Sequence, residues 1–114
     1  MRVIESLEKC YDILRTAADN VSKLLNIVKV FTDVHKPKAL WLRYYEGLNR
    51  LLVIAEVDQV DYDFVKHVVE SGVAVKISNS PSGYVVSFEV EIPGKILTFL
   101  NSIGALYETS DVLR

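Results

Sequence analysis

The sequence predicts an α+β fold in which helices pack against a four-stranded antiparallel sheet. Apolar residues recur at helical spacing in the first third of the chain, at 62–71 and after residue 94. Between these segments lie two pairs of short runs rich in β-branched and aromatic residues, each pair separated by turn-forming residues. The expected order is therefore helix-strand-strand-helix-strand-strand-helix, with a long helix at the N-terminus.

The length and composition favour one domain over residues 1–114. Half of the 114 residues are hydrophobic and a quarter are charged. A chain of this size buries roughly two-thirds of its unfolded surface, enough for one core. We expect a long amphipathic helix over 1–34 and a sheet-and-helix body over 38–114.

The N-terminal segment carries a heptad pattern, because Leu7, Leu14, Val21 and Val28 recur every seven residues. This spacing predicts a helix from 3 to 32. Such a helix is about 40 Å long, whereas the remaining body is about 30 Å across. Two arrangements follow: the helix lies across the sheet of its own chain, or it also pairs with a second chain.

The first predicted hairpin joins strands at 39–45 and 51–58, both rich in aliphatic and aromatic residues. A short helix follows at 62–71. Asp61 or Asp63 can cap the N-terminus of this helix.

The second predicted hairpin joins a strand at 73–77 to a strand at 86–92, through a turn at 79–83 that contains proline and glycine. The last segment, 95–107, has apolar residues at helical spacing, which predicts a final helix.

The first hairpin is partly apolar on both faces, although Arg43 and Glu56 lie on one of them. Trp41, Tyr45, Leu52 and Ile54 alternate with Leu40, Leu42, Val53 and Val57. The N-terminal helix can cover one of these faces, and either that helix or another subunit must cover the other. We therefore expect association, as a homodimer or with a protein partner. The expected interface residues are Leu7, Leu14, Val21, Val28, Phe31, Trp41, Tyr45, Leu52 and Ile54.

A basic and aromatic segment at 36–50 gives an alternative function, nucleic-acid binding. Its cations can contact phosphates and its indole can stack on a base. The candidate residues are Lys36, Lys38, Trp41, Arg43 and Arg50. The net charge of -2 gives this alternative no support from the chain as a whole.

Catalytic and metal-binding patterns are missing from the sequence. Its two histidines, His35 and His67, lie in different segments, and Cys10 is the single cysteine. The acidic residues at 56–63 suit a strand end and a helix start. We expect no metal, no cofactor and no catalytic residue; an enzyme would need a pocket converging on His67.

The predicted location is cytoplasmic. A single cysteine cannot form an intramolecular disulfide, the N-terminus lacks a leader pattern, and no apolar run is long enough to span a membrane. The scarcity of glutamine, cysteine and methionine is typical of thermophilic proteins.

Residues from about 73 onward form a predicted strand-strand-helix unit whose helix carries Asn101-Ser102 after the apolar run 96–100. This unit resembles the small dimerisation subunit of the KEOPS tRNA-modification complex. Two departures are that Glu91-Ile92-Pro93 replaces an Ala-x-Asp motif and that 96–98 lacks the arginine of that family. The resemblance implies a non-catalytic subunit that dimerises through its sheet and helices and presents a helical surface to a larger enzyme.

Overall fold

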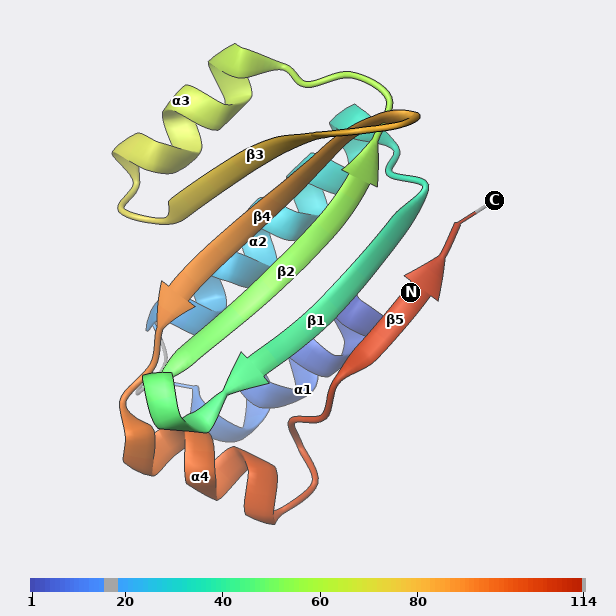
Figure 1. Cartoon of the computed structure of the whole chain (residues 1–114). Coiled ribbons are helices and arrows are strands. Elements are labelled where there is room, and N and C mark those ends of the chain that lie inside the picture. The colour runs from blue at the N-terminus through green and yellow to red at the C-terminus, as the bar shows by residue number, and fades with distance from the viewer. Residues whose placement is uncertain (16–18, 114) are drawn as a thin grey trace.

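A computed structural model of the chain describes residues 1–15 and 19–113. It has an α+β fold with a five-stranded antiparallel sheet, which two helices cross on one face (Figure 1). The elements in chain order are α1 (Arg2–Leu14), α2 (Asp19–His35), β1 (Ala39–Tyr45), the 3-10 turn η1 (Glu46–Leu48), β2 (Arg50–Val57), α3 (Tyr62–Glu70), β3 (Ala74–Ser80), β4 (Gly83–Glu91), α4 (Gly94–Ser102) and β5 (Thr109–Val112). The α+β class and the antiparallel sheet are confirmed, but the prediction of four strands is wrong.

The predicted helix from 3 to 32 is also wrong, because two helices occupy this segment. Helix α1 ends at Leu14, and Arg15 follows it with a left-handed φ of 39°. Helix α2 begins at Asp19. The part of the predicted helix at 16–18 lies outside the described residues. The heptad pattern continues across the break because both helices turn an apolar stripe to the same sheet.

Helices α1 and α2 lie side by side and run in opposite directions behind the sheet (Figure 1). The start of α1 meets β5, where the Val3 N–H donates to Asp111 over 2.9 Å. The end of α2 lies by the loop before α3, where the Asp61 N–H donates to His35 over 3.0 Å. Their packing gives a helical hairpin rather than one rod.

The sheet has the strand order β3-β4-β2-β1-β5, so β2 is its central strand. Each neighbouring pair is antiparallel. The β1–β2 and β3–β4 hairpins join where β2 pairs with β4. Between them the chain passes through α3, whose start is capped by the Asp61 carboxylate, which accepts from the Asp63 and Phe64 N–H groups. The N-cap predicted at Asp61 or Asp63 is thus supplied by Asp61.

The predicted helix over 95–107 is shorter in the structure, since α4 ends at Ser102. Gly104 then takes a φ of 70°, which reverses the chain after the helix. The following residues form β5, which pairs with β1 from Ala39↔Val112 to Leu42↔Thr109. Four residues are too short for a hydrophobic alternation to reveal this strand in the sequence.

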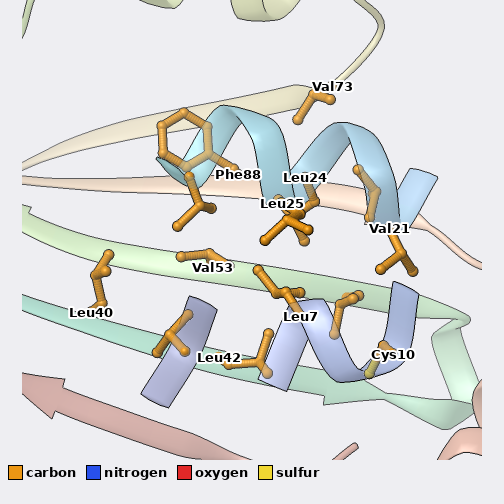
Figure 2. Packing of buried hydrophobic residues seen from close by; sticks show 14 of the residues in the cluster. Leu7, Cys10, Val21, Leu24, Leu25, Leu40, Leu42, Val53, Val73 and Phe88 are labelled. Atoms are coloured by element: carbon orange, nitrogen blue, oxygen red, sulfur yellow. The ribbon is translucent and has the colours of Figure 1, made fainter. Parts of the chain in front are cut away.

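The core lies between the sheet and helices α1 and α2 (Figure 2). Leu7 and Leu24 project from the helices toward Leu42 and Val53 of the sheet, and all four are fully buried. No helix within residues 1–15 and 19–113 has the length and apolarity needed to cross a bilayer.

Candidate protein-interaction surface

The sheet face opposite α1 and α2 is not covered by any helix of the described residues (Figure 1). Along β2 the burial alternates strictly, with Leu51, Val53, Ala55 and Val57 buried and the residues between them partly exposed. In β1, Leu40 and Leu42 lie in the core, and Trp41 between them is partly exposed. The side chains between the buried ones therefore lie on the uncovered side, which we call the open face.

The strand register places the residues of the open face in rows. Trp41 of β1 lies opposite Ile54 of β2, which lies opposite Ser87 of β4. The next row places Arg43 opposite Leu52, and Leu52 opposite Glu89. The centre of the open face is therefore apolar, since Trp41, Leu52 and Ile54 are contiguous and partly exposed.

The charges surround this apolar centre and nearly balance. The basic side chains on the strands of the open face are Arg43, Arg50 and Lys76, and the acidic ones are Glu56, Glu89 and Glu91. Two further contacts neutralise cations locally: Arg50 lies 3.8 Å from Glu89, and Arg43 lies 3.7 Å from Glu108. The open face thus has no excess of positive charge.

The central strand carries its charges at opposite ends. The outward residues of β2 are, in order, Arg50, Leu52, Ile54 and Glu56. Arg50 pairs with Glu89, whereas Glu56 forms no ion pair within the part of the chain that the structure describes. From the sequence, Arg50 was assigned only to the basic segment at 36–50, and its relation to Glu56 was missed. The period of two along 50–56 was the signal for this relation.

The structure places the two halves of the predicted interface in different environments. Trp41, Tyr45, Leu52 and Ile54 lie on the open face, and Tyr45 is 42% exposed. The helical residues lie in the core of their own chain instead. Leu7, Val21, Val28 and Phe31 have no exposed surface, and Leu14 packs against the core. In this structure α1 and α2 turn their apolar stripes to the sheet, so these side chains are not presented to a second chain.

The basic residues of the alternative function are scattered and paired. The Lys38 ammonium lies 2.9 Å from Asp58 and bonds Ser82 at the far end of the sheet from Arg50. Lys36 is exposed in the link between α2 and β1. Of the five predicted residues, only Trp41, Arg43 and Arg50 share the open face. Arg43 lies 3.7 Å from Glu108 and Arg50 lies 3.8 Å from Glu89, and these nearby negative charges weaken the electrostatic attraction for phosphate.

His67 lines a hollow on the surface of the molecule. It is 81% exposed on α3, where it lies 3.8 Å from Glu70. A hollow of about 250 Å³ between α2 and α3 reaches it, and the other residues around this hollow are Asn26, Ile27, Val30, Phe64, Val68 and Ser71. Among the described residues that line the hollow, His67 is the one titratable group.

Cys10 and the carboxylates were considered as possible metal ligands or reactive groups. The Cys10 thiol donates to the carbonyl oxygen of Ala105 over 3.3 Å, and burial raises its pKa to about 11. Within residues 1–15 and 19–113 no three histidine, cysteine or carboxylate side chains converge as metal ligands would.

Comparison with known proteins gives no relative. No model of a known protein family matches the chain, and no curated protein or solved structure does so either. The resemblance to the KEOPS dimerisation subunit therefore stays a prediction from the sequence.

Proposed function

We propose that this protein is a non-catalytic association module that binds another protein chain through its open face. The observation that supports this function is the uncovered apolar centre formed by Trp41, Leu52 and Ile54. A contiguous apolar patch rimmed by polar groups is typical of a protein-binding surface. The resemblance to the KEOPS subunit implies the same class of function.

The energetics favour covering this centre. Removing a large apolar side chain from water stabilises a complex by at most about 1.5–3 kcal/mol. The three central side chains are already partly buried in the sheet, so each contributes less than this limit. Their sum favours a complex, and a charged rim that is complementary to the partner adds to it.

Nucleic-acid binding is the less favoured function. Four phosphate contacts would need four available cations. Lys38, Arg43 and Arg50 each lie near a carboxylate of their own chain, and the open face carries as many acidic as basic residues.

The proposed function is tested by comparing the native mass of the full chain with that of Ile54→Glu. The mass is measured by light scattering after size exclusion, both for purified protein and for tagged protein in an extract of the source cells. We expect the wild type to belong to an assembly larger than its 12.9 kDa chain and Ile54→Glu to elute at monomer mass. The control is Val34→Glu, on the outer side of α2, where Val34 is 53% exposed.

Circular dichroism must first show that both variants fold. A folded Ile54→Glu protein that keeps the wild-type assembly would overturn the proposed function, because a carboxylate at the centre of the open face is incompatible with an apolar interface there. A wild type at monomer mass in both settings would also overturn it.

A further inference from the structure

We infer that the chain covering the open face is a second copy of this protein, related by a two-fold axis perpendicular to β2. This inference rests on the proposed function and names its partner. The axis runs across the strands in the plane between the two facing sheets and passes over β2 near Val53, so that the two copies of β2 run in opposite directions. Rotation about this axis places each strand over its own counterpart, so the two open faces overlap.

The outward residues of β2 are self-complementary in this orientation. Reading Arg50, Leu52, Ile54 and Glu56 against the same residues in reverse places Arg50 near Glu56 of the second copy. Leu52 then faces Ile54 of the second copy, and each contact occurs twice. Glu56, which has no ion pair within the described part of its own chain, gains an arginine.

The opposite orientation is unfavourable. If the two copies of β2 ran in the same direction, Glu56 would face Glu56 and Arg50 would face Arg50. Like charges placed together across an interface are repulsive, which selects against that arrangement. The order of charges along one strand therefore fixes the direction of the axis.

The neighbouring strands fit the same axis. In β1, Trp41 and Arg43 are successive outward residues, so the indole of one copy faces the guanidinium of the other. An arginine over a tryptophan ring is a favourable cation–π pair. Lys76 of β3 comes close to Glu89 of the second copy. Packed sheets cross at about 30°, and these long side chains can span the resulting offset.

The size of the open face predicts a dimer of limited affinity. Five strands about 4.8 Å apart and about seven residues long present roughly 450 Å² of flat area per copy. Stable complexes usually bury about 800 Å² of accessible surface per partner. A corrugated surface exceeds its flat projection, so the dimer falls at the lower end of this range. It should dissociate on dilution.

Charge-reversal variants test the axis. Glu56→Arg places an arginine at both ends of the series of outward residues along β2. Arg50→Glu places a glutamate at both ends of the same series. We expect each variant alone to lose at least about tenfold in dimer affinity, because like charges then meet. A 1:1 mixture of the two variants should form a heterodimer, since each arginine of one variant then faces a glutamate of the other. Sedimentation equilibrium over a dilution series measures all three samples.

Glu70→Arg on α3 is the matched control, because it reverses an exposed carboxylate away from the sheet and should dimerise like the wild type. Thermal melting must show that each variant folds. A monomeric wild type, a dimer that survives either reversal, or a mixture that stays monomeric overturns the inference. If the purified protein is monomeric but its assembly in the extract is lost in Ile54→Glu, the open face binds a different protein and only the second copy is excluded.

Discussion

His35 is held as a neutral imidazole by its surroundings. Its ring stacks on Phe31 with 4.2 Å between centroids and meets the edge of Phe64 at 5.4 Å. Its Nε2 accepts the Asp61 N–H over 3.0 Å. Burial lowers the pKa of His35, although a hydrogen bond to the Phe31 backbone and the Asp61 carboxylate oppose this shift.

A lowered pKa makes His35 a source of acid sensitivity. The unfolded chain binds a proton at His35 near its ordinary pKa, whereas the folded chain does so at a lower pH. The contribution to stability is therefore complete above the unfolded pKa and declines as the pH falls below it. Protonation would also end the role of Nε2 as an acceptor for Asp61.

We predict that His35→Phe reduces the loss of unfolding free energy between about pH 7 and about pH 5. The variant keeps an aromatic ring against Phe31 but removes the titrating group. Urea titrations at the two pH values measure the effect, and His67→Gln, at an exposed position, serves as the control. An equal loss in wild type and His35→Phe would contradict the prediction.

Cys10 is predicted to be inert in the folded protein. Its buried thiol has a pKa of about 11, so little thiolate forms near pH 8. An alkylating reagent should therefore label Cys10 only as urea unfolds the chain, and the labelling midpoint should match that of circular dichroism. Rapid labelling in the absence of urea would contradict this, because it would require the thiol to be accessible.

At the scale of elements, α1 depends on β5 for its N-terminal cap. Met1 provides no capping side chain, and the Asp111 carboxylate accepts the Val3 N–H over 2.9 Å in its place. Asp111 also lies 3.5 Å from the Arg2 guanidinium. The Asp111 side chain of the edge strand β5 thus links the N-terminus of α1 to the sheet.

We predict that Asp111→Ala lowers the free energy of unfolding by about 1–2 kcal/mol, the usual cost of losing a helix cap. Amide hydrogen exchange at Val3 and along β5 should accelerate more than exchange in β2. Asp12→Ala, an exposed site on the same helix, is the control. Unchanged exchange in both elements would mean that Asp111 does not join them.

The elements differ in how closely the sequence predicts them, for physical reasons. Strand β1 was predicted with its observed bounds, because its residues are mostly aliphatic and aromatic, which favours a strand, and because a lysine-proline segment and a turn lie on either side of it. The break between α1 and α2 was missed because no glycine or proline marks it, although Asp19 and Asn20 are residues typical of a helix start. The alternation in β1 and β2 placed Trp41, Tyr45, Leu52 and Ile54 on one face of the sheet. No sequence pattern could show that Val21 and Phe31 of α2 lie in the core of their own chain.

At the scale of the whole molecule, the apolar centre and charged rim predict a particular response to salt. Raising the salt from about 50 mM to about 1 M should weaken the dimer only a few-fold, because screening affects the rim while the apolar contacts persist. Light scattering at fixed protein concentration measures this. Dissociation by orders of magnitude would indicate an interface dominated by charge and would contradict the apolar centre.

The near balance of positive and negative charges on the open face predicts weak binding to single-stranded RNA. We expect no saturable binding in a fluorescence anisotropy titration near physiological salt, because three of the cations at 36–50 lie near carboxylates. Binding that weakens steeply with salt and is lost in Arg43→Gln would instead favour the nucleic-acid alternative.

The position of Trp41 makes the open face visible to spectroscopy. Trp41 is the single tryptophan of the chain, so all indole emission originates from the centre of this face. A partly exposed indole emits at longer wavelength and is quenched by acrylamide, and any chain that covers it shifts the emission to shorter wavelength. The unlabelled wild-type protein therefore reports its own association by fluorescence, whichever chain occupies the face.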